Sequence, residues 1–245
     1  MKSAAAGVLL WLVTVAGRAQ AAADLQVVFG TGSPDPWRSS ITVSSTSGQP
    51  THVVLSGAPD QICLPSTACT LANLDPFATQ TLTPPQFQGV GLTYVGSTGD
   101  DRRPAIAARA FDNIGRSVDL PIFRLEYLLA LDPGTLAFAG AVGGQSGRSN
   151  LLLANLGAMD QTEGGQVLLE INAMSPAGFF QASRNVLLNF GDTLFIQNVI
   201  AWAGLPSLDQ GQIIVTRRGG SGKFFGVMPL IRADGSLSVV SGSPP

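Results

Sequence analysis

Residues 217–224 contain the stretch of the sequence that most resembles a phosphate-binding loop. A P-loop requires a Gly, four further residues, and then Gly-Lys followed by a Ser or Thr whose hydroxyl binds Mg²⁺. Here Gly222 and Lys223 are followed by Phe224, and Arg217 stands where the first Gly should be. Apolar residues on both sides indicate two strands rather than a strand and a helix. We therefore predict that residues 219–222 form the tip of a β-hairpin.

Nucleophilic catalysis would require a base, and His52 is the only histidine of the chain. It lies in an alternating apolar segment at residues 51–55, which predicts a solvent-facing or structural position on a strand. No serine has the Gly-x-Ser-x-Gly surroundings of a hydrolase nucleophile. We predict no catalytic residues, and we expect that the protein is not an enzyme.

Paired carboxylates could hydrolyse a glycosidic bond. The three glutamates are far apart in the predicted elements: Glu126 at a domain junction, Glu163 in a turn and Glu170 on a strand. Asp100 and Asp101 could supply oxygen ligands to Ca²⁺, but two arginines follow them directly and neutralise the loop. We therefore expect no metal and no cofactor, with a carbohydrate-active or other hydrolase as the alternative.

The two cysteines, Cys63 and Cys69, are separated by five residues. Export to an oxidising compartment favours a disulfide between them. A metal site would need a second pair of His or Cys ligands, and a redox pair would have Cys-x-x-Cys spacing. A disulfide is therefore the prediction.

The N-terminus has the features of a signal peptide at residues 1–23. Lys2 precedes an apolar run at residues 4–16, and Ala-x-Ala motifs follow, with cleavage expected before Ala22 or Asp24. The run is too short to span a bilayer comfortably, although an uncleaved anchor is the alternative. We expect a secreted or periplasmic protein with no membrane span after cleavage.

Charge excludes one class of partner. The net charge is −2, and the predicted signal peptide contains Lys2 and Arg18, so the mature chain is more acidic still. Such a chain has no basic surface for nucleic acid or anionic lipid.

Short apolar or β-branched runs separated by Gly and Pro predict an all-β fold. One helical turn is expected at residues 198–203, with Asn198 and Gly204 at its ends. The predicted strands are residues 27–29, 40–45, 52–55, 80–83, 92–95, 105–110, 135–139, 150–155, 166–171, 185–189, 193–196, 212–216, 223–231 and 237–240.

A weak internal repeat relates the two halves of the chain. A shift of about 110 residues aligns Arg38-Ser39 with Arg148-Ser149, each following a Gly and a polar loop. Because both copies contain the arginine, a structural role is favoured over a partner-binding one. Each copy is expected to contain a hairpin with a glycine-rich tip and to close on an Asp-and-Gly turn, at residues 112–115 and 234–235.

These motifs resemble the tandem immunoglobulin-like β-sandwich repeats of secreted bacterial proteins. The likeness rests on residues 148–157 and 111–115; in the first copy, Ser44-Ser45 stands where Ala154-Asn155 occurs in the second. The resemblance implies two antiparallel sandwiches, domain 1 at residues 24–124 and domain 2 at residues 125–245. Pro133 and Gly134 are typical of a linker, so the boundary is expected near residues 124–134, with the apolar segment 127–131 packed at the junction.

The function implied is a non-catalytic binding, adhesion or envelope-associated module with an unknown protein or glycan partner. Edge strands are its natural contact surface. A structural subunit of a surface assembly is a further alternative. Trp37 and Trp202 could stack on a sugar, but their apolar neighbours favour packing in the core.

Overall fold

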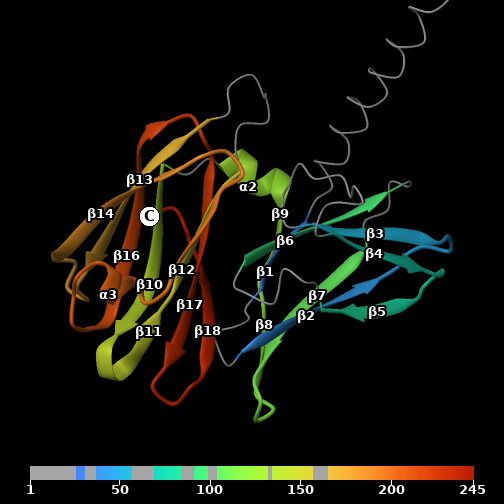
Figure 1. Ribbon diagram of the computed structural model, residues 1–245, viewed down its shortest axis with the longest axis horizontal. Coiled ribbons are helices and arrows are strands. Elements are labelled where there is room, and N and C mark those ends of the chain that lie inside the picture. The colour runs from blue at the N-terminus through green and yellow to red at the C-terminus, as the bar shows by residue number, and fades with distance from the viewer. Residues whose placement is uncertain are drawn as a thin grey trace, which may run out of the picture. The chain divides into compact units, whose positions relative to one another are not determined.

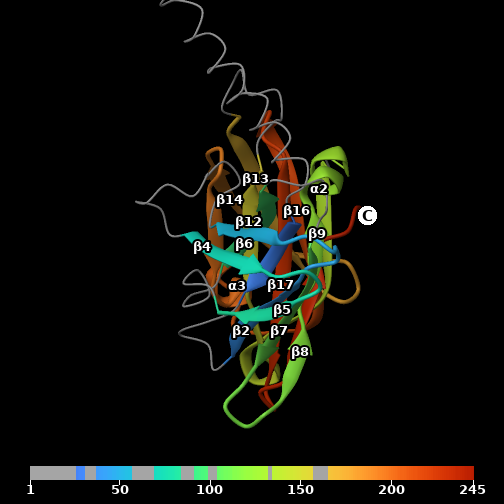
Figure 2. The same cartoon turned by 90° about the vertical axis from the view of Figure 1, so that its right-hand side faces the viewer.

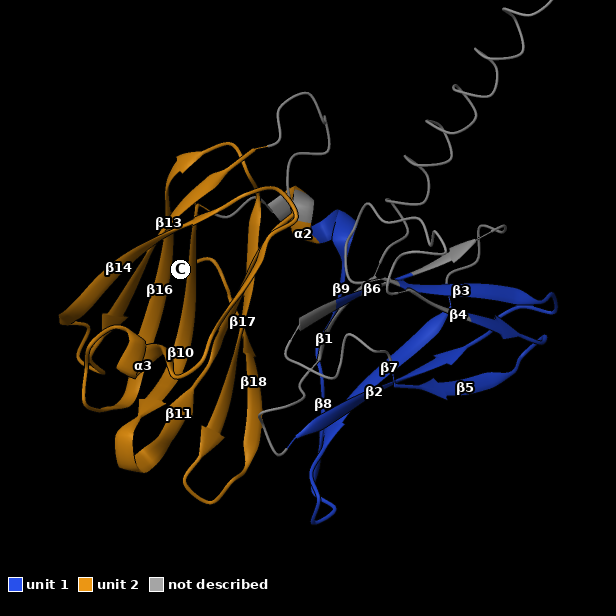
Figure 3. Cartoon of the chain, viewed as in Figure 1, with its two compact units in different colours: residues 1–127 blue, residues 128–245 orange. Residues whose placement is uncertain are grey.

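The computed structural model describes residues 26–30, 37–56, 69–83, 91–98, 104–131, 134–156 and 165–245 (Figure 1). The predicted all-β class is confirmed, since the described residues lie mostly in antiparallel strands. The chain divides into two compact units, residues 1–127 and 128–245 (Figure 3). In the described residues, no helix is long and apolar enough to cross a membrane. The predicted signal peptide lies outside them.

Unit 1 contains two antiparallel sheets (Figure 2). The first has the order β4-β3-β6-β1-β9, with β1 Gln26–Gly30, β3 Thr51–Ser56, β4 Cys69–Leu74, β6 Gly91–Thr98 and β9 Ile122–Arg124. The second has the order β5-β2-β7-β8, with β2 Arg38–Ser44, β5 Thr79–Leu82, β7 Ala105–Phe111 and β8 Ser117–Asp119. Strict alternation along β2 buries Ser39, Ile41 and Val43, as a sheet with one covered face requires.

Unit 2 also contains two sheets. One has the order β10-β16-β13-β14, with β10 Thr135–Gly143, β13 Val167–Met174, β14 Phe180–Leu188 and β16 Leu208–Gly220. The other contains β11 Gly147–Ser149, β12 Leu151–Asn155, β15 Thr193–Ile196, β17 Phe224–Arg232 and β18 Leu237–Ser241. Because β11 and β12 pair with β17 in one continuous register, they act as a single strand interrupted at Asn150.

Both sheets of unit 2 contribute to one hydrophobic core. Phe138, Ile171 and Val215 enter it from the first sheet, and Leu153 and Met228 from the second. All five side chains are buried, so the two sheets are held together mainly by the removal of apolar surface from water. The 3₁₀ turn η2 Gly144–Ser146 and the helix α3 Val199–Trp202 connect strands at one end (Figure 1).

The strand order is the same in the two units. The strands of each unit are numbered from its first strand, with β11 and β12 counted as one strand. In both units, one sheet then has the order fourth, third, sixth, first, and the other has the order fifth, second, seventh, eighth. Unit 1 adds β9 beside β1. Arg38 pairs with Phe111 on the seventh strand of its unit, and Arg148 pairs with Ile231 on the seventh strand of the other. The two arginines therefore occupy equivalent positions in register.

The predicted hairpin around residues 219–222 is wrong in its pairing. Strands flank the glycines as expected, but β16 pairs with β10 and β13, whereas β17 pairs with β11, β12 and β18. The loop therefore carries the chain from one sheet to the other. In unit 1, β6 and β7 likewise belong to different sheets, so the corresponding hairpin prediction is also wrong.

Two further local predictions have different outcomes. The helical turn is confirmed as α3, where the Asn198 side chain accepts a hydrogen bond from the Ala201 N–H and Gly204 has φ +90°. The segment expected to pack at the domain boundary, residues 127–131, lies in helix α2 Leu125–Leu131, a helix that the sequence did not predict; Leu125 and Leu128 of this helix are buried.

Candidate functional site

The glycines of the β16–β17 loop serve close backbone packing. Gly220 has φ +85°, and a Cβ there would collide with the Gln166 carbonyl oxygen. A Cβ on Gly222 would lie 2.6 Å from the Asn155 Oδ1 atom. Because this space is filled by protein, the loop has the geometry of a tight crossing rather than of a phosphate cradle.

The buried Asn155 side chain holds this crossing in place. Its Nδ2 donates to the carbonyl oxygens of Gly165, at 2.7 Å, and Leu188, at 3.1 Å. In unit 1 the equivalent residue is Ser45, whose Oγ donates to the Gln49 carbonyl at 3.5 Å. The backbone N–H groups of Ser45 and Asn155 each donate at 2.9 Å, to Ala78 and Asp192 respectively. The Ser-for-Asn difference in the sequence thus falls on a shared structural position.

His52 lies on the exposed side of β3, as predicted. Its Nδ1 is 2.6 Å from the Asn73 Oδ1 atom on the neighbouring strand β4. The interaction is a cross-strand hydrogen bond between exposed side chains.

Glu170 forms an ion pair on the outer face of β13. Arg218 donates to it through Nε at 2.8 Å and also through Nη2, and the Asn172 amide donates at 3.1 Å. The Asn172 hydrogen bond, followed by those of Arg218, lowers the pKa of Glu170. Glu170 is therefore a stable carboxylate rather than a proton donor.

Of the remaining acidic residues singled out in the sequence, only Glu126 lies in the described part of the chain. Glu126 lies 3.8 Å from Arg124 in unit 1, while Glu163, Asp100 and Asp101 lie outside the described residues. Within the described ranges, no group of three or more His, Cys, Asp or Glu side chains could hold a metal ion.

Asp112 anchors the turn between β7 and β8. Its buried carboxylate accepts the backbone N–H groups of Ile114 and Arg116 and the Arg116 Nε at 2.7 Å. Burial opposes ionisation, but the hydrogen bonds from Arg116 and Ile114 outweigh it and lower the pKa of Asp112 below 3.8. The Arg116 guanidinium also lies 5.7 Å from the centre of the buried Trp37 ring. The hydrogen bonds of Asp112 therefore give the predicted Asp-and-Gly turn at residues 112–115 a structural role.

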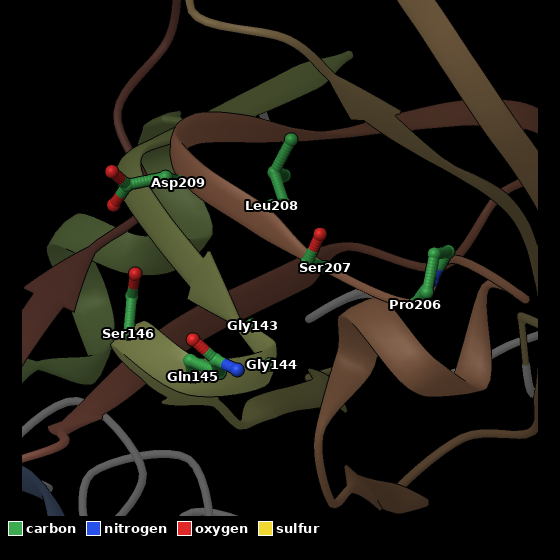
Figure 4. A pocket seen from close by; sticks show the side chains of 8 residues that line it. All are labelled: Gly143, Gly144, Gln145, Ser146, Pro206, Ser207, Leu208 and Asp209. Carbon is green, nitrogen blue, oxygen red and sulfur yellow. The ribbon is translucent and has the colours of Figure 1, made fainter.

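A hollow of about 430 Å³ opens at one end of unit 2 (Figure 4). It lies between the η2 turn and the loop before β16, and it is lined by Gly143, Gly144, Gln145, Ser146, Pro206, Ser207, Leu208 and Asp209. Asp209 is its only ionisable residue, and no aromatic side chain lines it. Acid–base chemistry on a bound sugar needs two carboxylates, so this lining does not supply it.

The tryptophans, arginines and cysteines singled out in the sequence differ in their burial. Trp37 is buried, and Trp202 packs against the core of unit 2 beneath the Arg184 guanidinium. Arg38 is exposed, and Arg148 is half-buried. Cys69 begins β4, but Cys63 lies outside the described residues. No disulfide occurs among the residues described, and the Cys63–Cys69 bond stays a prediction.

The sequence reasoning missed one surface, which we call the β14 apolar surface. Its members are the five large exposed hydrophobic side chains in the described part of unit 2: Leu168, Phe179, Phe180, Leu187 and Phe190. Phe179 is 70 % exposed, Phe180 60 % and Leu187 55 %. The signal that could have revealed it is the pair Phe179-Phe180 directly after Gly178, where turns normally carry polar residues.

β14 itself is an edge strand. Among the described strands the nine-residue strand β14 pairs only with β13, so no described strand covers its other edge (Figure 1). Exposed apolar side chains along an edge strand are a feature that folded proteins usually cover or pair.

Comparison with known proteins adds no family assignment. No family model matches the chain, and no curated protein matches it significantly.

Proposed function

We propose that the chain is a non-catalytic exported binding module built from two tandem β-sandwiches. The shared strand order of the two units and their equivalent turns support a duplicated fold. The shared core of the two sheets in unit 2 supports a sandwich. The predicted signal peptide supports export to the periplasm or the cell exterior.

The immunoglobulin-like resemblance is supported in size and in part of the strand order. In an immunoglobulin sandwich, the first strand lies beside the second, and the last lies beside the sixth. Here the first strand of each unit lies beside the sixth, and the seventh lies beside the second. The proposal is therefore a two-sheet sandwich with its own arrangement of these strands.

The observation that carries the binding function is the β14 apolar surface. Exposed phenylalanines flank β14 at both ends, and the strand's free edge can accept another strand by main-chain hydrogen bonding. In contrast, β5 is an edge strand of unit 1 whose exposed residues are Thr79, Gln80 and Thr81. Large exposed apolar side chains therefore occur within β14, as Phe180 and Leu187, but not within β5.

The test is binding of the mature protein to cell-envelope fragments from its source. We expect co-sedimentation of the wild type and a loss of about tenfold for a variant with Phe180→Ser and Leu187→Ser, because both side chains lie at the proposed contact. Gln80→Lys on β5 is the matched control and should bind like the wild type. Unchanged binding by the double variant would place the contact elsewhere, and no binding by the wild type would contradict the function.

The competing function is a hydrolase working in the hollow beside Asp209. We expect no turnover of glycoside, ester or peptide substrates by the purified protein. Turnover that is abolished by Asp209→Asn would overturn the non-catalytic proposal.

A further inference from the structure

On one side of unit 2, the two sheets end in the strands β14 and β15, and no described strand pairs with their outer edges. β15 has only four residues. On the opposite side, β10 and the segment after β18 are joined by the Ala137–Ser243 bridge. β14 is therefore the longest free edge among the described strands of this unit, and the β14 apolar surface lies along it.

The outer face at this edge has apolar ends and a polar centre. Leu168 pairs with Leu187 at one end, and Met174 pairs with Phe180 at the other. The central pairs are Glu170 with Asn185 and Asn172 with Ser183, and Arg218 already neutralises Glu170.

We propose that the occupant of this edge is the β14 strand of a second copy of the chain, paired antiparallel about a two-fold axis. This inference names the partner of the contact surface proposed above and rests on that proposal. Rotation about such an axis brings each apolar end of one strand to the opposite apolar end of the other, which is the self-complementarity that an isologous dimer needs.

The register follows from a bulge at the start of β14. The pairing of β14 with β13 is regular from Ala182 to Leu188 and shifts between Ala182 and Phe180. A symmetric pair that uses the whole regular section is centred on its middle residue, Asn185.

The Asn185-centred register places compatible side chains opposite each other. Each Ala182 lies opposite Leu188 of the other copy, and Phe180 lies near Phe190 of the other copy. Arg184 faces Val186 rather than the second Arg184, whereas an axis through residue 184 would oppose two like charges.

The exposed area is sufficient for a specific dimer. With about 200 Å² for each phenylalanine, the exposed fractions of Phe179, Phe180 and Phe190 leave about 340 Å² uncovered per copy. Two copies, with the leucines and the paired backbone included, reach the roughly 1,000 Å² at the lower limit of specific interfaces. We therefore expect a weak dimer with a Kd on the order of 10 μM.

Sedimentation velocity of the purified mature protein, over concentrations that bracket this Kd, tests the pairing. We expect the wild type and the Gln80→Lys control to dimerise. Asn185→Lys and Asn185→Asp should each raise the Kd at least about tenfold, because each places two like charges on the axis. An equimolar mixture of the two variants should restore dimers, because opposite charges then meet there.

The outcomes separate the register, the dimer and the binding function. Restored dimers in the mixture support the Asn185-centred register, and failure of the mixture to associate while the wild type dimerises overturns it. A wild type that stays monomeric at every concentration overturns the dimer. If that monomer still binds envelope fragments through Phe180 and Leu187, the proposed function stands without the self-pairing.

Discussion

Phe77 adopts a left-handed backbone that bulky side chains disfavour. Its φ is +57°, and the side chain is 71 % exposed. The equivalent residue of unit 2 is Gly191, with φ +76°, in a turn closed by the same kind of backbone hydrogen bond.

Replacing Phe77 with Gly should stabilise unit 1 by about 1 kcal/mol, because the left-handed conformation costs a residue with a Cβ about that much. Urea unfolding of the two proteins measures the difference. The reciprocal change Gly191→Ala should destabilise the protein, and a Phe77→Gly variant less stable than the wild type would show that the exposed ring packs usefully.

Asp112 gives unit 1 a pH-dependent contribution to stability. Because the pKa of Asp112 is lower in the folded protein than its ordinary value of 3.8, the carboxylate stabilises the fold above that pH. The contribution is lost as the pH falls through the folded-state pKa.

Asp112→Asn should therefore destabilise the protein at pH 7 and have a progressively smaller effect below about pH 3.8. Urea unfolding of wild type and variant at several pH values checks this. A stability difference that is the same at neutral and acidic pH would assign the effect to shape rather than to charge.

At the residue scale, the chemistry of single side chains was enough to exclude a P-loop and to predict the exposure of His52, but it did not reveal which apolar side chains remain uncovered. The P-loop was excluded because Phe224 lacks a hydroxyl, and the solvent-facing position of His52 followed from strand alternation. The β14 apolar surface was missed because Phe180 and Leu187 look the same in sequence whether a neighbouring strand covers them or not.

At the scale of elements, Gly220 is essential to the geometry of the β16–β17 crossing. Gly220→Ala should cost about 2 kcal/mol or more, since it combines a left-handed φ with a collision against the Gln166 carbonyl. Gly219→Ala is the matched control, because its Cβ would meet only the Leu168 Cβ at 3.9 Å, and should stay within about 0.5 kcal/mol of the wild type. Equal effects of the two changes in thermal unfolding would contradict this assignment.

The strands themselves were largely predictable, whereas their partners were not. The apolar composition of residues 223–231 predicts a buried strand. Whether β16 or β12 is its neighbour depends on contacts between residues far apart in the sequence. The three-residue strands β8 and β9 are too short to show alternation. In α2, Leu125 and Leu128 give only one helical spacing, which is too little to distinguish a helix from a packed linker.

At the scale of the whole molecule, unit 2 has a complete core of its own, and we expect residues 128–245 to fold alone. The fragment should unfold cooperatively in urea, with a stability on the order of 5 kcal/mol. Limited proteolysis of the full chain should cut near residues 132–134 and leave two protected halves. A fragment without a cooperative transition, or a protected core that crosses the boundary, would show that the units depend on each other.

The pairing of Leu152 with Val227 has a consequence for biosynthesis. In unit 2, β17 lies between β12 and β18, yet it leaves the ribosome only after β13, β14, β15 and β16. Until Phe224 and the residues after it have emerged, the nascent chain displays Leu152 and Leu153 without their neighbour. Unit 2 therefore cannot complete its fold before β17 has emerged, and a message interrupted upstream of β17 yields a polypeptide that chaperones and proteases will recognise.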